Sequence, residues 1–498
     1  MHPRTSVTLA SSNWDWLVPS WPLILGFFAF AKAMATPAVL NDPDTYLHIA
    51  AGRWILDHLA LPFADPFSHT MPGAPWVPHE WLAETIFAAG FGIGGWGAIR
   101  FITALSFAIS LAVLTRLLLR RFDPLSSLIV AAGSAWLLLP HLLARPHILA
   151  LPLLVIWCGE LIAARDAGRT PSLWLLAVMN LWANLHGGFM FGLALTGFLG
   201  AEAVLLAAAG QPRLLEARRW GGFLALSALA ALATPNGLAG LLQPIHLIST
   251  PAMLAAIVEW QSPKLADFPA LEVWLLGAVC LGFASGFRLP LIRLLLTLGI
   301  FHLALQHVRH ADLLAIVVPL ATAAALGAQI RDRLRAMPTS TLTHRLDRLA
   351  APAAAPAVAV ILALMLAIGG AIALRPLDRS GDAATPAAAL AAARSMGGSG
   401  PVFNSHPYGG YLISEGVPVF IDGRVEMYGN EFLSRYLAAS GGDETALVEL
   451  LDKYRIGWAI QQPRDGAVAV LDRLPGWRRA YADAQAVVHT RTPPTAAR

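Results

Sequence analysis

The sequence has few charged residues and almost no cysteine. Only 13% of its 498 residues are charged and 56% are hydrophobic, a balance too apolar for a soluble protein of this length. The two cysteines, Cys158 and Cys280, both lie in apolar stretches and far apart in sequence. A disulfide framework, a thiolate metal site and cysteine redox chemistry are therefore not indicated.

A large excess of positive charge is also missing. The formal net charge is +4, and most of the excess lies in short connections between apolar stretches, where membrane orientation explains it without a nucleic-acid partner. Apolar stretches long enough to cross a bilayer, which takes roughly 20 residues each, recur from Trp21 to Leu374. We therefore expect an all-α polytopic membrane bundle of about 11 transmembrane helices, followed by a small α/β domain.

Two kinds of connection alternate along the apolar part of the chain. Arg-rich connections take turns with connections rich in Asp, His, Trp and Asn. Because short cytoplasmic loops collect Lys and Arg, this alternation predicts a cytoplasmic N-terminus and an extracytoplasmic C-terminal domain. The first span, which begins at Trp21, lacks the short apolar core and cleavage site of a signal peptide, and we expect it to remain as an anchor. Nearly all the reactive side chains then fall on the extracytoplasmic face.

The composition changes after Arg375, where ordinary globular patterning replaces the long apolar stretches. We expect a transmembrane domain over residues 1–375, a linker rich in Pro, Ala and Gly over 376–400, and a small α/β domain over 401–498. The transmembrane domain includes a large first outer segment at 41–97. In the small domain, strands are predicted at 401–404, 411–413, 418–421, 457–460 and 486–490, and helices at 431–439, 444–454 and 466–474.

Two carboxylates and an imidazole stand at the start of the first outer segment. Asp44 and His48 are four residues apart, so they share one face if a helix begins near Asp44. Asp44 could equally cap that helix. Together with Asp42, these side chains could bind a divalent cation such as Mg²⁺ or Mn²⁺, or supply a general base.

The same segment contains a second imidazole and carboxylate, at His79 and Glu80. This pair could complete a metal or acid–base site, or it could be an ordinary surface pair.

Polar residues also occupy the remaining outer connections. Any single one could simply extend from the end of a span toward the interface. The two arginines among them have a further use, because a guanidinium binds the phosphate of a lipid headgroup in bidentate fashion. The candidate substrate-binding residues are Arg145, His147, Asn184, His186, Asn236, Glu259, Arg309 and His310.

A dense polar cluster follows a predicted strand in the C-terminal domain. Its members are Asp422, Arg424, Glu426 and Tyr428. They could form internal ion pairs at a strand-to-helix turn, or a lip that contacts a substrate above the membrane.

Several of these blocks resemble a group of bacterial multi-span proteins placed among the C-type (GT-C) glycosyltransferases. The resemblance covers most of the chain and rests on residues 42–55, 75–82, 184–189, 234–237, 259–260, 309–310 and 420–428. It implies an enzyme of the bacterial inner membrane that takes a sugar from a polyprenyl-phosphate donor. The acceptor, on the extracytoplasmic side, would be a glycan, a lipid or a protein.

The resemblance also implies roles for particular residues. Asp44 or Asp42 would be the base or a metal ligand, oriented by His48 and His79. Arg145 and Arg309 would hold the lipid phosphate as it leaves. A cavity in the bundle would accept the polyprenyl chain, and the C-terminal domain would position the acceptor.

Two other classes of function remain open on the sequence. A transporter of an anionic or lipid-linked solute would place ionisable residues within spans, and Lys32 and Glu202 are the candidates for such residues. A non-catalytic scaffold of the cell envelope would need none of the acidic and histidine residues of the first outer segment.

Overall fold

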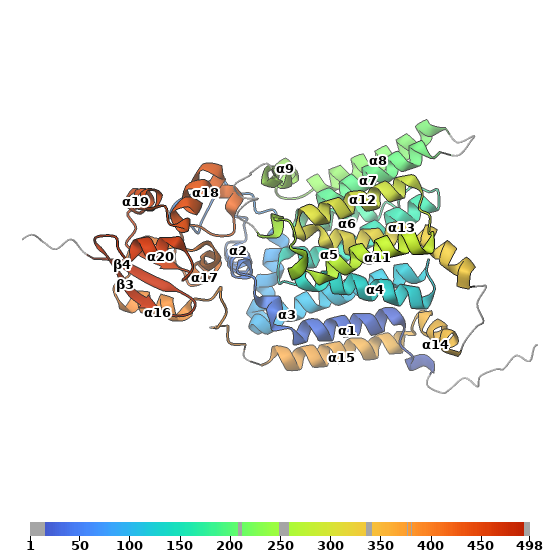
Figure 1. Cartoon of the computed structure of the whole chain (residues 1–498), viewed down its shortest axis with the longest axis horizontal. Helices are drawn as coiled ribbons and strands as arrows, with labels where there is room; N and C mark the ends of the chain where they lie inside the picture. Colours follow the sequence, from blue (N-terminus) through green and yellow to red (C-terminus); the bar gives the residue numbers. More distant parts are fainter. Residues whose placement is uncertain are drawn as a thin grey trace, which may run out of the picture.

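Apolar helices form a bundle that makes up most of the chain, and a small α/β domain packs at one end of it (Figure 1). The computed structural model describes residues 15–207, 212–248, 258–334, 341–375, 377–379 and 381–492. Each predicted span coincides with a helix. These helices are α1 (Trp21–Ala35), α3 (Trp81–Leu119), α4 (Pro124–Leu138), α5 (Pro146–Asp166), α6 (Leu175–Leu185), α7 (Phe189–Leu205), α8 (Arg213–Leu232), α11 (Pro269–Ser285), α12 (Leu291–Gln306), α13 (Ala311–Leu334) and α15 (Ala355–Ala373).

Several of these helices have the length and composition of a membrane span. In the described part of the chain, five helices are long and apolar enough to cross a bilayer. Helices α8 and α9 (Gly237–Ile248) add a sixth span if the pair, bent by 101°, is one broken span, and five further apolar helices are shorter. The chain is a multi-pass membrane protein.

The two kinds of connection lie at opposite ends of the bundle. Helix α14 (Thr341–Ala350), which is rich in arginine, and the start of α8 are at the end away from the small domain (Figure 1). The connections rich in Asp, His and Trp lie at the other end, which we call the domain-facing end.

Buried ion pairs tie the bundle together near its Arg-rich end. Arg293 on α12 donates to Glu202 on α7 at 2.9 Å and to Asp166 at the end of α5 at 3.0 Å. Arg293 and Glu202 are both buried, and charges are stable there only when they are paired. Glu202 therefore has a structural partner, and its presence inside the bundle needs no transport pathway.

Helix α2 (Asp44–His58) packs against the first part of α3 at the domain-facing end (Figure 1). The approach is so close that a Cβ atom on Gly52 would lie 2.0 Å from the carbonyl oxygen of Glu84. Helix α3 then breaks at Gly94 and Gly95. Gly95 has φ +55° and ψ −144°, a conformation that costs little only for glycine. The break lets α3 change direction between α2 and the bundle.

The C-terminal domain contains a four-stranded sheet in the order β1-β2-β4-β3. Strands β1 (Val402–Asn404) and β2 (Trp458–Gln461) are parallel, whereas β4 (Val487–Arg491) runs antiparallel to both β2 and β3 (Trp477–Ala482). The domain's helices are α16 (Ala387–Ser395), α17 (Gly409–Ser414), α18 (Val425–Gly441), α19 (Glu444–Lys453) and α20 (Gly466–Leu471).

Two predicted strands of this domain are wrong. Residues 411–413 belong to helix α17, which packs against α2, so its apolar residues face another helix and not a sheet. Residues 418–421 join none of the named strands, and Val419 forms an isolated bridge to Ser68 of the 41–97 segment. In both cases the apolar run is buried by a contact with the N-terminal part of the chain.

The C-terminal domain is fastened to the 41–97 segment. The amide of Val419 donates to the carbonyl of Phe67 at 3.1 Å, and the amide of His69 donates to the carbonyl of Val419 at 3.0 Å. The guanidinium of Arg424 lies 2.7 Å from the carboxylate of Asp65. The two segments therefore form one layer over the domain-facing end of the bundle.

Candidate active site

A cavity of about 860 Å³ opens where this layer meets the bundle. Its walls come from the 41–97 segment, from the domain-facing ends of bundle helices and from residues 423–426 of the C-terminal domain. Its volume is within the range of ordinary small-molecule sites. Nine of the predicted site residues line it: Asp44, His48, His79, Glu80, Arg145, His147, His186, Glu259 and Arg309. Three more are also in the wall: His310, Arg424 and Glu426.

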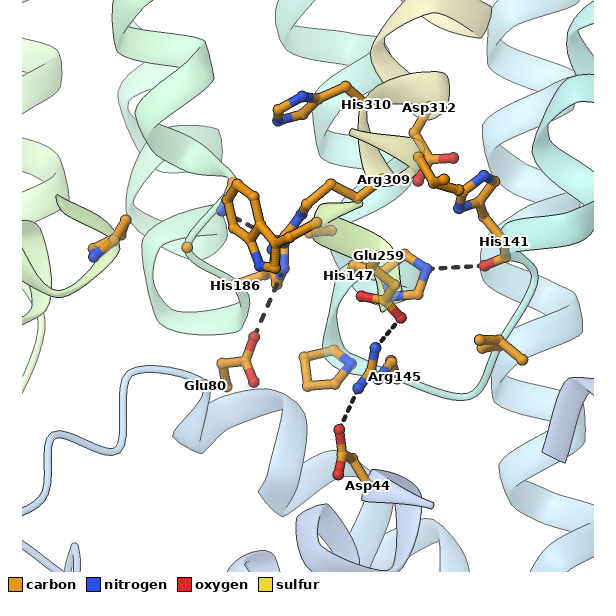
Figure 2. Close-up of a pocket in the computed structure, with 18 of the residues that line it drawn as sticks. Asp44, Glu80, His141, Arg145, His147, His186, Glu259, Arg309, His310 and Asp312 are labelled. Carbon is orange, nitrogen blue, oxygen red and sulfur yellow. Dashed lines mark hydrogen bonds and ion pairs between the residues drawn. The ribbon is translucent and has the colours of Figure 1, made fainter. Parts of the chain in front are cut away.

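Arg145 is the centre of a cluster of three carboxylates. Its guanidinium contacts Asp44 and Glu259 by direct hydrogen bonds and lies 2.8 Å from Asp42 through Nε. Figure 2 shows Arg145 between Asp44 and Glu259, which approach it from different segments. Arg145 precedes Pro146, which favours an extended backbone at the preceding residue, and it has φ −125° and ψ 161°. That conformation directs the arginine away from α5 toward the acids.

The two aspartates of the cluster have different positions. Asp44 lines the cavity, whereas Asp42 lies behind it, with its side chain 4% exposed. The amide of Asp44 donates to the Asp42 carboxylate at 2.8 Å, so Asp42 accepts a backbone hydrogen bond at the start of α2. Asp44 does not cap the helix with its own side chain. Of the two carboxylates, only that of Asp44 therefore faces the cavity.

Burial and charge act in opposite directions on these acids. Burial raises the pKa of Asp42 to about 6, although Arg145 opposes the shift. Burial also acts to raise the pKa of Asp44, but the charges of Arg145, His406 and His48 outweigh it and lower the pKa of this carboxyl. The pKa of Glu259 is likewise lowered, because Arg145 outweighs the effect of burial. Asp44 and Glu259 are thus held as carboxylates.

His48 faces a partner that the sequence did not indicate. Its Nδ1 lies 3.4 Å from the carboxylate of Glu84 on α3, and both residues are buried. Burial disfavours the charged imidazole, but the hydrogen bond to Glu84 and the charge of Glu80 raise the pKa of His48. His48 shares a face with Asp44, as the spacing predicts, because both side chains line the cavity.

Glu80 lies between two imidazoles. Its carboxylate is 3.7 Å from His186 Nε2 and 3.9 Å from His79 Nε2. Figure 2 shows His186 reaching toward Glu80 from the connection between α6 and α7. Burial and the positive charge of Arg309 lower the pKa of His186 well below its usual value, so this imidazole is neutral.

Arg309 lies across the cavity from Asp44, in the short turn before α13 (Figure 2). Its guanidinium stacks over the Trp260 ring at 4.3 Å. Within the described residues, no carboxylate lies within ion-pair distance of Arg309, in contrast to Arg145. His147 and His310 line the same region. Arg309 is therefore the arginine available to an anion.

Asn184 and Asn236 do not line the cavity. Asn184 accepts a hydrogen bond from the Trp81 indole at 2.8 Å, and Asn236 donates to the carbonyl of Pro78 at 3.0 Å. Both asparagines thus connect the bundle to the 41–97 segment and support the wall.

The polar cluster of the C-terminal domain divides into two parts. Asp422 binds Arg424 through both oxygens, at 2.8 and 2.6 Å, and accepts a hydrogen bond from Tyr428 at 2.8 Å. These contacts are the internal ion pairs that the sequence offered as one interpretation. Glu426, in contrast, lines the cavity. Gly423 lies directly against Asp44, since a Cβ atom at position 423 would be 2.4 Å from Asp44 Oδ1.

Asp42, Asp44 and His48, the predicted cation ligands, each contact a charged group of the protein in this structure. Arg145 occupies the space between the two aspartates, and His48 turns to Glu84. Over the parts of the chain that the structure describes, no group of three or more His, Cys, Asp or Glu side chains could hold a metal ion.

The acidic residues Glu84 and Asp312 are among the parts of the cavity wall that sequence reasoning missed. Glu84 lies one helical turn after Glu80, and that spacing is the only signal that could have marked it. Asp312 directly follows His310 and Ala311 at the start of an apolar span, where an acidic residue is unusual enough to suggest a function.

Solved structures resemble this fold. The oligosaccharyltransferase AglB from Archaeoglobus fulgidus, in complex with an inhibitory peptide and a dolichol-phosphate, superposes with a TM-score of 0.52 at 13% identity, over 89% of this chain and 69% of that chain. The apo form gives the same values. The chain has the GT-C fold. ArnT from Cupriavidus metallidurans bound to undecaprenyl phosphate gives a TM-score of 0.47 at 16% identity, over 97% of this chain and 100% of that chain.

No protein-family model matches the sequence, and no curated protein matches it. The GT-C fold is thus recognised from the three-dimensional arrangement of the chain. Within this GT-C fold, the cavity lies between the bundle and the layer formed by the 41–97 segment and the C-terminal domain.

Proposed function

We propose that the protein transfers a sugar from a polyprenyl-phosphate donor to an acceptor hydroxyl at the domain-facing end of the bundle, on the extracytoplasmic side of the bacterial inner membrane. The observation that carries the proposal is the charge arrangement in the cavity. On one side of the cavity, Arg145 binds the carboxylates of Asp44 and Glu259. On the other side, Arg309 has no carboxylate partner among the described residues. The GT-C fold supports it, and AglB was solved with a dolichol-phosphate.

Each side of the cavity suits one part of such a reaction. Positive charge develops on the anomeric carbon as the bond to phosphate breaks, and the carboxylates of Asp44 and Glu259 would stabilise it. Negative charge develops on the departing phosphate, which the guanidinium of Arg309 would bind. His186, held neutral by burial and by Arg309, would donate a hydrogen bond to the same phosphate without adding charge.

The test is an assay of the purified protein with a panel of undecaprenyl-phosphate sugars, in which release of undecaprenyl phosphate is followed. We expect release by the wild type and a loss of at least about 100-fold in Asp44→Asn, the range for removal of one group that stabilises charge in the transition state. Asp57→Asn, an exposed carboxylate on the same helix, is the matched control and should retain full activity.

The same assay with a chelator addresses the divalent cation. Because Arg145 already supplies a positive charge among the three carboxylates, we expect activity to persist in the chelator. No release from any donor, with Asp44→Asn indistinguishable from the wild type, would reject the transferase in favour of transport or scaffolding.

A further inference from the structure

The cavity contains several carboxylates, and most of them already have partners. Asp44 and Glu259 are bound by Arg145, Glu84 pairs with His48, and Glu80 lies between two imidazoles. A carboxylate bound to a guanidinium is a weak base, because taking up a proton would cost it that contact. In the proposed transfer, another group is better suited to accept the proton of the acceptor hydroxyl.

Glu426 is such a group. It stands in the first turn of α18 and reaches the cavity from the C-terminal domain. Among the described residues, no other side chain forms a hydrogen bond or an ion pair with it; its carboxylate accepts a hydrogen bond only from its own backbone amide. Its neighbour Arg424 is already bound by Asp422 and Asp65, and His79 with Glu80 faces it from the 41–97 segment. Its carboxylate is therefore close to charged groups but not committed to any of them.

The position of Glu426 suits a group that acts on the acceptor and not on the donor phosphate. The donor phosphate is assigned to Arg309, at the ends of the bundle helices, whereas Glu426 belongs to the layer that covers this end of the bundle. Asp312, another cavity acid, lies beside His141 in the first turn of α13, on the Arg309 side (Figure 2). An acceptor that attacks opposite the departing phosphate would meet Glu426 and not Asp312.

We propose that Glu426 is the base that takes the proton from the acceptor hydroxyl, so that the C-terminal domain supplies a catalytic group to a site otherwise built by the bundle and the 41–97 segment. This inference rests on the proposed function. The acceptor oxygen forms a bond to the anomeric carbon, the bond from that carbon to phosphate breaks with its electron pair left on the phosphate, and the proton passes to the Glu426 carboxylate. Burial raises the pKa of Glu426, which strengthens it as a base.

A change of nucleophile tests this role. Azide is an anion and attacks without losing a proton, so it needs no base, whereas water and glycerol do. In the assay with undecaprenyl-phosphate sugars, we expect Glu426→Gln to slow release with water or glycerol by about 100-fold, the lower end for general base catalysis. With azide, release should stay within about twofold of the wild type, and glycosyl azide should form. Glu426→Asp should recover part of the activity with glycerol.

The matched control is Glu431→Gln, an exposed acid on the same helix, which should behave like the wild type with every nucleophile. Asp312→Asn should show no preference for azide. An equal loss with azide and glycerol would mean that Glu426 only supports the structure, and no loss at all would also overturn the inference while leaving the transferase intact. A wild type inactive with every donor and nucleophile would reject the transferase itself, and the inference with it.

Discussion

At the scale of single residues, the cavity depends on Arg145. It binds carboxylates from two distant parts of the chain, at positions 42, 44 and 259. Removal of one member of such an ion pair is costly, because the remaining member becomes a buried, unpaired charge. Arg145 therefore acts as a structural centre of the acid cluster, and we infer that the phosphate-binding role suggested for both arginines falls mainly to Arg309.

Removal of this guanidinium should be strongly destabilising. In Arg145→Met we expect a loss of about 3 kcal/mol and inactivity, measured by thermal unfolding in detergent and by the release assay. The double variant Arg145→Met, Asp44→Asn should recover part of the stability, since one stranded charge is gone. Arg120→Met breaks an exposed pair with Glu160 and should cost less than about 1 kcal/mol. Equal effects at both arginines would contradict the assignment.

The raised pKa of Asp42 predicts a dependence of stability on pH. Because burial raises this pKa to about 6, the folded protein holds the proton of Asp42 more tightly than the unfolded chain does. The resulting stabilisation is full below the ordinary pKa and is lost as the pH rises through about 6. Asp42→Asn has no such loss. We expect the melting temperature of this variant, relative to that of the wild type, to increase between pH 4.5 and pH 7.

The control for this measurement is Asp57→Asn, at an exposed acid of α2, whose difference from the wild type should not vary over that range. A constant difference for Asp42→Asn as well would show that Asp42 titrates normally.

At the scale of secondary structure elements, close contacts between α2 and α3 position the acids. Helix α2 carries Asp44 and His48, and α3 carries Glu84. Because Gly52 has no side chain, α2 can lie directly against the backbone of Glu84 on α3. The apolar periodicity of the sequence places these helices, but how near they come depends on one residue without a side chain.

Gly52→Ala should therefore separate α2 from α3. Its Cβ would lie 2.0 Å from a backbone oxygen, a contact that only movement of a helix can relieve, and overpacking of this kind costs roughly 1–3 kcal/mol. We expect a lower melting temperature and a large loss of activity. Gly92→Ala on α3, where nothing lies within 4 Å of the added atom, should be neutral or slightly stabilising. An active Gly52→Ala with unchanged stability would refute this account of the packing.

At the scale of the whole molecule, the cavity is closed by two segments more than 300 residues apart in sequence. The C-terminal domain binds the 41–97 segment through Arg424 and Asp65 and through backbone hydrogen bonds of Val419. Gly423 then rests against Asp44. The domain thus contacts the acid cluster directly and forms part of the wall.

A side chain at position 423 should disturb the acids without unfolding the domain. The Cβ of Gly423→Ala would lie 2.4 Å from Asp44 Oδ1, so the carboxylate must move away from it and from Arg145. We expect activity to fall by about tenfold or more, a usual cost of misplacing a group near the reaction centre, with a change in melting temperature of only a few degrees. Gly441→Ala, at a position with no atom within 4 Å of the added Cβ, should retain full activity. Full activity in Gly423→Ala would show that the domain does not act on Asp44.

The sequence by itself determined the architecture. Apolar stretches have the length that a bilayer demands, and each predicted span is a helix in the structure. It also indicated most of the ionisable residues of the cavity, including Asp44, Arg145, Glu259 and Arg309, because polar residues that alternate with Arg-rich connections collect at one end of a bundle. The sequence alone therefore identified the chemical groups of the cavity, but not how they are arranged.

Only the tertiary structure decided how these residues pair. Whether Arg145 meets a phosphate or carboxylates depends on contacts between residues more than 100 positions apart, and local periodicity carries no information about such contacts. For the same reason, Glu84 was missed as the partner of His48, and residues 411–413 and 418–421 were taken for strands. Their apolar side chains are buried by α2 and by the 41–97 segment, so burial and not sheet formation explains their composition.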